Sequence, residues 1–388
     1  MRALLRDVLE EWESGRPVAL GTVIATWRSA PQPVGASMIV DSDGAVVGSV
    51  SGGCVEGAVY EIAQKAIADG QPALEHYGVS DDDAFAVGLM CGGMLDVFIE
   101  RIDPASYPEF GTIVADVEAG RPVAVATLVE HPDRSRVGRR MIVRSHERAD
   151  PDGAVGVEGS LGSDRMDAAV ETDARGALST GVSTTLTYGP EGERLESGAR
   201  VFVAAFAPRP RMIIFGAVDF ALSLSRVGAF LGFHVTVCDA REVFATPSRF
   251  PDADEVVVDW PHRYLAQELE DRRIDDRSVL VVLTHDAKFD VPVLEIALRA
   301  PQIRYVGAMG SRRTHDDRME RLRDAGLTDE ELSRLSSPLG LDLGARTPEE
   351  TAVSIAAEII ALSSGGSGAR LGSQTGPIHH RDTEADPS

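Results

Sequence analysis

The chain has 388 residues, of which 43% are apolar, and its 38 basic and 61 acidic side chains give a formal net charge of −23. Such an acidic surface repels nucleic acid and anionic membranes, and no continuous apolar run approaches the roughly 18 residues of a membrane span. We therefore expect neither a nucleic-acid nor a membrane partner. The opening MRALLRDVLEEWESG is an amphipathic helix interrupted by acids rather than a signal peptide, so we expect a cytoplasmic protein.

The first half of the chain alternates between apolar, β-branched runs and helical patterns. Residues 71–88 are polar and acidic, and we expect them to form loops. The predicted helices are 2–13, 55–67 and 108–119, and the predicted strands are 16–27, 38–40, 45–47 and 94–100.

At Arg121 the pattern restarts. RPVAVATLV (121–129) echoes RPVALGTVI (16–24), and we interpret residues 16–100 and 121–205 as two divergent copies of one α/β unit. The alternative is a chance likeness between α/β stretches of similar composition. In the second copy Arg165 falls where Cys54 stands, and nothing corresponds to Cys91-Gly92-Gly93. Residues needed only for the fold would recur in both copies, so the first copy is the candidate working site.

The second half is organised around residues 211–241. An apolar strand meets a turn at Gly216, a helical pattern follows, and a second strand ends on Asp239. Strand, glycine turn, helix, strand and acid form the first unit of a dinucleotide-binding fold, in which the acid lies where a ribose hydroxyl is bound. The fingerprint departs from G-x-G-x-x-G at Val218, and Asp219 adds negative charge. The sequence therefore predicts a Rossmann-like fold more firmly than it predicts bound NAD(P).

Further strands are predicted at 255–258, 278–283 and 303–306, with a helix at 291–298. Thr347, Pro348 and Glu350 indicate a strong helix start. The predicted fold class is α/β: an N-terminal two-copy α/β domain followed by a C-terminal Rossmann-like, doubly wound parallel sheet. The predicted parts are domains at 1–206 and 207–362 and a low-complexity, disordered tail at 363–388.

Cys54 is placed where a glycine turn opens a helix. Free N–H groups and the helix dipole favour anions there, so we expect its thiol to have a depressed pKa. Gly52 and Gly53 leave room for a ligand to reach the backbone, and Glu56 could orient an amine or amide.

Cys91 also lies beside a double glycine, Gly92 and Gly93. Two thiolates in a chain with three cysteines and no signal peptide favour a soft metal or a sulfur-bearing ligand over a disulfide. Cys54 and Cys91 are the candidate metal ligands. The alternative is that both are small residues packed in tight turns.

A second group of polar residues follows predicted parallel strands, at the edge where ligands of open α/β sheets bind. A turn with N–H donors and guanidinium groups suits a phosphate or another anion. The candidates here are Thr284, His285, Gly307, Gly310, Ser311 and Arg312, in addition to Gly216 and Asp239.

Taken together and in order, these motifs resemble the XdhC/CoxI family of xanthine dehydrogenase accessory proteins. The resemblance covers residues from about 5 to 362. It is carried by Ser29-Ala30-Pro31, Gly35-Ala36, Gly52-Gly53-Cys54-Val55-Glu56, Cys91-Gly92-Gly93, Phe215-Gly216-Ala217, Val306-Gly307-Ala308-Met309-Gly310-Ser311 and the segment 340–350.

The resemblance implies a chaperone that binds the molybdenum cofactor, of the molybdopterin type. Such proteins support sulfuration of the cofactor by a cysteine desulfurase and its insertion into a molybdenum hydroxylase. Members are sometimes labelled xanthine dehydrogenase, but three cysteines are too few for iron–sulfur clusters. An NAD(P)-dependent oxidoreductase using the Rossmann domain is the alternative, and a homodimer is a further expectation, since sheet edges need cover.

Overall fold

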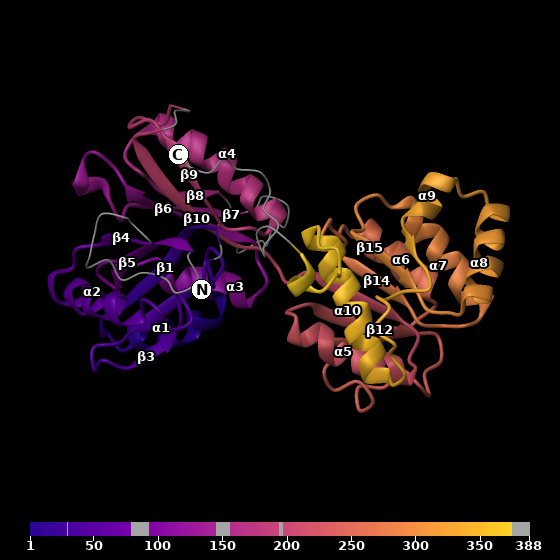
Figure 1. The fold of residues 1–388 in the computed structure, drawn as a ribbon. Helices are drawn as coiled ribbons and strands as arrows, with labels where there is room; N and C mark the ends of the chain where they lie inside the picture. The colour runs from indigo at the N-terminus through magenta and orange to yellow at the C-terminus, as the bar shows by residue number, and fades with distance from the viewer. Residues whose placement is uncertain (29, 79–92, 145–155, 194–196, 375–388) are drawn as a thin grey trace. The chain divides into compact units, whose positions relative to one another are not determined.

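The computed structural model describes residues 1–28, 30–78, 93–144, 156–193 and 197–374 (Figure 1). They form two compact units, one covering Met1–Pro208 and the other beginning at Arg209. None of the described helices is long and apolar enough to cross a membrane.

The first unit contains two five-stranded sheets in which every pairing is antiparallel. The first sheet has the order β3-β2-β1-β5-β4, and the second has the order β8-β7-β6-β10-β9. The strands of the first sheet are β1 (Val18–Trp27), β2 (Ser37–Val40), β3 (Val46–Gly48), β4 (Ala73–Tyr77) and β5 (Met94–Ile102). The strands of the second are β6 (Val123–Glu130), β7 (Arg140–Arg144), β8 (Val157–Gly159), β9 (Thr184–Tyr188) and β10 (Ala199–Phe206).

Along the chain, each sheet has one long helix between its third and fourth strands. This helix is α2 (Glu56–Asp69) in the first sheet and α4 (Asp164–Thr180) in the second. Gly48 and Gly159 end the third strand of their sheets with φ of +87° and +83°. A Cβ there would lie 2.4 Å from the Ser37 carbonyl oxygen and 2.5 Å from that of Arg140. These shared features support the interpretation of residues 16–100 and 121–205 as copies of one unit.

The inner faces of the two sheets pack on each other and on α1 (Leu5–Glu13) and α3 (Phe110–Glu118). This shared core includes Leu20 and Phe98 from the first sheet and Val125 and Phe202 from the second. The outer faces are covered by α2 and α4, which form separate apolar clusters with their own sheets.

Opposite charges join the two sheets at the edge of this core. Arg200 Nη2 of β10 lies 2.7 Å from Asp96 Oδ2 of β5, and Arg140 of β7 pairs with Glu100 of β5. Burial raises the pKa of Glu100 although Arg140 opposes the change. Each of these two ion pairs takes one partner from each sheet, so the two sheets are complementary in charge at this edge.

The second unit is built on a six-stranded, fully parallel sheet with the order β13-β12-β11-β14-β15-β16. The chain leaves β11 toward one edge and returns at β14 toward the other, so the strand order reverses between these two neighbours. The strands are β11 (Arg211–Phe215), β12 (His234–Asp239), β13 (Glu255–Val258), β14 (Val279–Val282), β15 (Tyr305–Ala308) and β16 (Leu335–Ser336).

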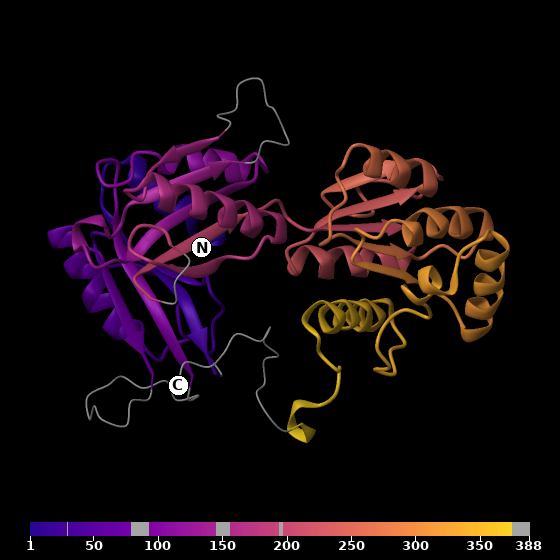
Figure 2. The same cartoon turned by 90° about the horizontal axis from the view of Figure 1, so that it is seen from above.

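Helices cover both faces of this sheet. One face packs against α5 (Asp219–Phe230) and α10 (Pro348–Ser364), which lie side by side in both views (Figures 1 and 2). The other face packs against α6 (Pro261–Glu270), α7 (Ala287–Arg299), α8 (Arg312–Asp324) and α9 (Asp329–Ser333).

The predicted fold class is confirmed, and so is the helix start at Thr347, whose hydroxyl accepts a hydrogen bond from Glu350 N–H in a capping box. Two local predictions are wrong. Residues 73–77, expected in a loop, form strand β4, and the strand predicted at 303–306 is shifted to 305–308. The shift places Gly307 inside β15. The structure describes 3-10 turns at Arg2–Leu4, Arg134–Arg136 and Leu371–Ser373, and residues 375–388 of the predicted tail lie outside the described residues.

Candidate functional site

The loop that carries Cys54 is folded around a single carboxylate, that of Glu56. Its Oε1 accepts hydrogen bonds from Ser49 Oγ at 2.6 Å, Ser51 N at 2.9 Å and Val50 N at 3.3 Å. Its Oε2 accepts from Ser51 Oγ at 2.5 Å, Gly53 N at 2.9 Å and Val55 N at 3.2 Å. These polar groups of the turn therefore point inward at a carboxylate supplied by the first residue of α2.

These contacts explain the acidity of Glu56. Burial alone would raise its pKa, but the hydrogen bonds from Ser49, Ser51 and the backbone outweigh it and lower the pKa from 4.5 to about 2. Glu56 is therefore a permanent anion that holds the turn in shape at physiological pH.

The expectation of free N–H groups around Cys54 is consequently wrong. Cys54 N donates to Ser51 Oγ at 2.9 Å, Gly52 N donates to Ser49 Oγ at 2.9 Å, and Gly53 N is taken by Glu56. The Glu56 carboxylate is equally occupied, so it has no spare oxygen to orient an amine or amide. An external anion would have to displace a group that the chain already supplies.

The thiol and the two glycines remain accessible. Gly52 and Gly53 are exposed, have φ of +74° and +115°, and have no atom within 4 Å of where a Cβ would be. Cys54 is a free cysteine that is half-buried against the apolar cluster beneath α2. The turn thus presents one sulfur beside an open stretch of backbone.

The second copy contains the same turn in a reduced form. Asp167 stands for Glu56 and accepts from Ser160 Oγ at 2.6 Å and Leu161 N at 2.8 Å. The helix start itself is capped by Ser163, whose hydroxyl accepts from Met166 N at 3.2 Å. A carboxylate that organises the turn is therefore common to both copies, while the thiol is not.

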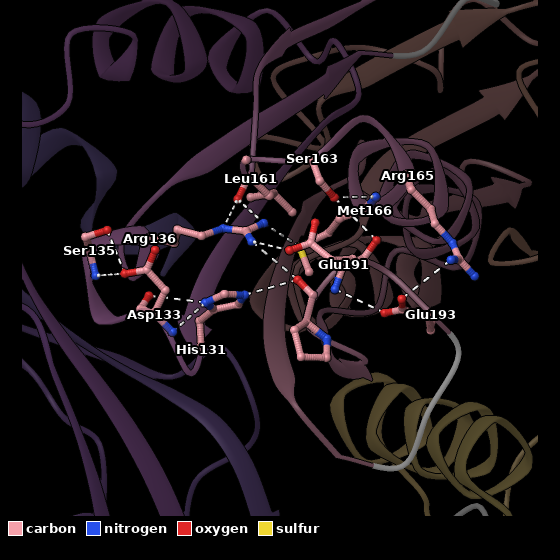
Figure 3. A network of polar contacts seen from close by, with 12 residues as sticks. His131, Asp133, Ser135, Arg136, Leu161, Ser163, Arg165, Met166, Glu191 and Glu193 are labelled. Carbon is pink, nitrogen blue, oxygen red and sulfur yellow. Dashed lines mark hydrogen bonds and ion pairs between the residues drawn. The ribbon is translucent and has the colours of Figure 1, made fainter.

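In the second copy a network of other side chains packs against this turn (Figure 3). The buried guanidinium of Arg136 donates to the Leu161 carbonyl at 3.0 and 3.2 Å and to the Pro190 carbonyl at 3.4 Å. A Cβ on Gly162 would lie 2.7 Å from Arg136 Nε, and one on Gly192 only 2.4 Å from Met166 Cα. Arg136 and Met166 thus pack closely against Gly162 and Gly192, while Gly162, Asp164 and Arg165 stay exposed.

The remaining cysteines differ in position. Cys91 and Gly92 lie outside the described residues, and Gly93 directly precedes β5. Cys238 is fully buried in β12, and burial raises the pKa of its thiol. Among the described residues, no three His, Cys, Asp or Glu side chains are grouped to hold a metal ion.

In the second unit the first candidate residues lie where the strand order reverses. A Cβ on Gly216 would be 2.9 Å from the Thr284 methyl carbon, so the ends of β11 and β14 are tightly packed. Asp239 is buried, and its carboxylate accepts from Ala217 N at 2.8 Å and from Arg241 Nε and Nη2 at 2.9 and 2.8 Å. These bonds overcome burial and lower the pKa of Asp239. The acid expected to bind a ribose is therefore already paired within the chain.

The glycine turn after β15 is shorter than predicted. Gly307 is a buried strand residue, and a Cβ there would meet the Tyr305 hydroxyl at 2.5 Å. Ser311 caps α8 by accepting from Thr314 N at 3.2 Å. Arg312 and His285 are exposed, and a Cβ on Gly310 would lie 3.0 Å from Thr314 Cβ. Of this group, Arg312 and His285 face solvent, while Gly307 leaves room for the side chain of Tyr305.

Beneath these turns lies a buried ion pair. Arg318 Nη2 of α8 is 3.1 Å from Asp290 Oδ2 of α7 and donates to the Met309 carbonyl at 2.8 Å, while Nη1 donates to Ser337 Oγ at 3.0 Å. Asp290 also accepts from the Thr284 hydroxyl. One guanidinium therefore ties together the segments that follow β14, β15 and β16.

Two of these roles were not foreseen from the sequence, those of Glu56 as the centre of its turn and of Arg318 as a tie. The first has a signal, since a serine is followed seven positions later by an acid in each copy, at Ser49 and Glu56 and at Ser160 and Asp167. The sequence contains no comparable signal for the role of Arg318, because its partner Asp290 lies 28 residues away.

Comparison with known proteins adds independent information. Residues 212–359 match the family model of the XdhC Rossmann domain, and residues 11–78 and 116–189 match that of the XdhC and CoxI family. A probable xanthine dehydrogenase subunit from Bacillus subtilis (strain 168) is 27% identical over 359 residues, covering 92% of this chain and 96% of that protein.

Two further relatives have similar extents. The molybdenum cofactor insertion chaperone PaoD of Escherichia coli (strain K12) is 25% identical over 361 residues, covering 93% of this chain and 88% of that protein. A crystal structure of a xanthine dehydrogenase from Bacillus halodurans superposes with a TM-score of 0.68 at 25% identity, covering 96% and 97% of the two chains. The likeness therefore extends over both units and not over one domain alone.

Proposed function

The chain belongs to the XdhC and CoxI family, and from that premise we propose that it is an accessory protein that binds a molybdenum cofactor of the molybdopterin type. It supports the sulfuration of this cofactor, with a cysteine desulfurase as partner, and its insertion into a xanthine dehydrogenase or CO dehydrogenase-type molybdenum hydroxylase. The relative named as an insertion chaperone supports this role.

The observation that carries the proposal is the exposed turn at Gly52, Gly53 and Cys54. Glu56 keeps this turn folded whether or not a ligand is present, so the thiol is positioned in advance. In the second copy an exposed Arg165 stands at the position of Cys54, and Arg136 bonds to the turn at Leu161. The turn of the first copy thus carries a sulfur, while that of the second carries none.

The residues present fit such a cofactor by their chemistry. Thiolate is the ligand type that soft metal centres prefer. When bound, a molybdopterin supplies its own dithiolene sulfurs to the metal, so the protein needs no cluster of metal-binding side chains. The described residues contain no such cluster, and Cys54 supplies one further sulfur. Whether Cys91 adds a second stays a prediction.

The alternative function, an NAD(P)-dependent oxidoreductase, finds little support in the Rossmann unit. Asp239 is already bonded to Ala217 and Arg241, and Val218 and Asp219 stand where a pyrophosphate would approach α5. We therefore place this unit's role in holding the cofactor rather than in hydride transfer.

The proposal is tested with protein purified from a molybdate-fed host, by metal analysis and by fluorescence of oxidised pterin. We expect the wild type to carry molybdenum and pterin, and Cys54→Ala to lose at least about nine-tenths of both. Arg165→Ala is the matched control, since it changes the corresponding position of the second copy and should keep the cofactor.

Equal cofactor content in wild type and Cys54→Ala would remove Cys54 from the site. Absence of cofactor from all three proteins, together with a dinucleotide carried through purification, would instead favour the oxidoreductase.

A further inference from the structure

A cluster of aromatic rings and cations lies at the carboxyl edge of the parallel sheet, and the candidate residues discussed above do not include it. We call it the aromatic edge and define it by Arg241, Phe244, Trp260, Lys288 and Phe289. Trp260 is 40% exposed and Phe244 43% exposed, which is unusual for such large apolar side chains. Exposed aromatic surface beside fixed positive charge is typical of a ligand-binding surface.

Three loops bring these residues together. Asp239 of β12 and Val258 of β13 are paired in the ladder, so Arg241 and Trp260, each two residues further on, belong to neighbouring loops at the carboxyl edge of the sheet. The Trp260 ring packs on that of Phe289, at the start of α7, with centroids 5.2 Å apart. The loop after β13 therefore reaches the loop after β14 across the end of the sheet.

Arg241 is held in a fixed orientation. Asp239 binds it through Nε and Nη2, and its guanidinium carbon lies 4.6 Å from the centroid of Phe244. Its Nη1 makes no hydrogen bond with any group that the structure describes. Bonds to Asp239 first, and the charge of Asp286 more weakly, raise the pKa of Arg241. One edge of a permanent, preorganised cation is thus left to bind an anion.

A second cation, Lys288, lies beside Phe289, the ring on which Trp260 packs. Lys288 Nζ is 4.8 Å from the centroid of Phe289 and 2.9 Å from Asp286 Oδ2. Next to Trp260, the Nδ1 atom of His262 is buried without a hydrogen-bond partner among the described groups, and its ring centroid is 6.0 Å from that of Trp260. The ring of Trp260 therefore has two neighbours, Phe289 with Lys288 beside it and His262 with an unused polar atom.

From this arrangement we infer that the aromatic edge binds a planar heteroaromatic ring that carries an anionic group. The ring stacks on Trp260, and the anion bonds to the free edge of Arg241. Base–aromatic stacking and guanidinium–phosphate pairing are the interactions that recognise such ligands. The identification of the ring as the pterin of the cofactor rests on the proposed function, whereas the class of ligand does not.

The inference is tested on the full chain by calorimetric titration with pterin-6-carboxylate, CMP and inorganic phosphate. We expect pterin-6-carboxylate to bind, with at least a tenfold loss of affinity in Trp260→Leu and in Arg241→Lys. Lysine keeps a positive charge for the buried Asp239 but lacks the free guanidinium edge, so this variant should fold. Arg226→Gln, which changes an exposed arginine of the same unit, should bind as the wild type does.

Binding that neither variant weakens, or no binding of any probe, would overturn the inference. Tighter binding of CMP than of the pterin acid would overturn the assignment of the ring to a pterin in favour of a nucleotide base. If the two variants purify with a full complement of cofactor, the aromatic edge is not its site and the proposed function stands. If neither the wild type nor any variant carries cofactor while the probes bind as expected, the proposed function fails and the inference stands.

Discussion

Replacing Arg318 with methionine is expected to lower the free energy of unfolding of the second unit by about 3–5 kcal/mol, because the substitution leaves the buried carboxylate of Asp290 without its partner. Both side chains are less than one-tenth exposed, so water cannot replace the lost contacts. Arg318 also donates to Met309 and Ser337, which would lose their bonds. For a unit of this size the melting temperature should fall by roughly 6–20 °C.

The measurement is scanning calorimetry of the full chain at several pH values. Burial already raises the pKa of Asp290, and loss of Arg318 should raise it further. The destabilisation caused by a carboxyl whose folded pKa lies above its unfolded value develops as pH rises from the unfolded to the folded value, and it is complete above the folded value. The deficit of the variant should therefore be largest at high pH and shrink as pH is lowered through the raised folded pKa of Asp290.

The matched control is Arg226→Met, which removes an exposed ion pair with Asp252 at 3.1 Å in the same unit. An exposed pair contributes less than about 1 kcal/mol, so this variant should remain close to wild type at every pH. A loss no greater than that of the control, or a loss that does not change with pH, would contradict the role assigned to Arg318.

Much of the architecture could be predicted because local patterns carry it. The β11 strand, the turn at Gly216, α5 and the acid at the end of β12 follow from hydrophobic periodicity and glycine position within one short stretch. The capping box at Thr347 is equally local. Such features depend on residues a few positions apart, which a single sequence displays directly.

Features set by strand pairing could not be read in the same way. Gly307 belongs to a glycine-rich stretch that indicates a turn, yet its pairing with Val281 extends β15 by two residues beyond the predicted end. Strand β4 lies in a polar segment, and only its pairing with β5 makes it a strand. In both cases the hydrogen-bonded neighbour outweighs the local preference.

In the candidate site, too, some features are visible in the local sequence and others depend on how the chain folds. The accessible glycine turn with its thiol was visible in the sequence, but the direction of its N–H groups was not. That direction depends on one acid seven residues after Ser49, whose carboxylate folds back into the turn. Arg241 and Trp260 could not be connected either, since the pairing of β12 with β13 brings them together.

The largest effect in the first unit is expected from Glu56→Gln. The amide keeps the size of the side chain, but its nitrogen cannot accept the hydrogen bonds that converge on one carboxylate oxygen. Because hydrogen bonds to a charged group contribute about 1.5–3 kcal/mol each and those in one network are not additive, we expect a loss of about 2–4 kcal/mol. The donors left unpaired include the N–H of Gly53, so the Cys54 turn should lose its fixed shape.

The pH dependence of this stabilisation has a defined sign. The folded pKa of Glu56, about 2, lies below its ordinary value of 4.5, so the contribution is present above pH 4.5 and is lost as pH falls toward 2. Urea unfolding at about pH 7 and about pH 3 should show the wild type approaching the variant at the lower pH. Asp167→Asn is the control in the second copy, where the carboxylate accepts from Ser160 and Leu161 and the turn is also held by Arg136.

The two variants should separate stability from function. Glu56→Gln should reduce the molybdenum and pterin carried by the purified protein, since the thiol of Cys54 is no longer held in place. Asp167→Asn should lose some stability and keep its cofactor, because the second copy carries no thiol and has Arg165 where the first has Cys54. If both variants lost cofactor to the same extent, the effect would come from the common fold of the first unit. If neither did, Glu56 would stabilise the turn without positioning a ligand.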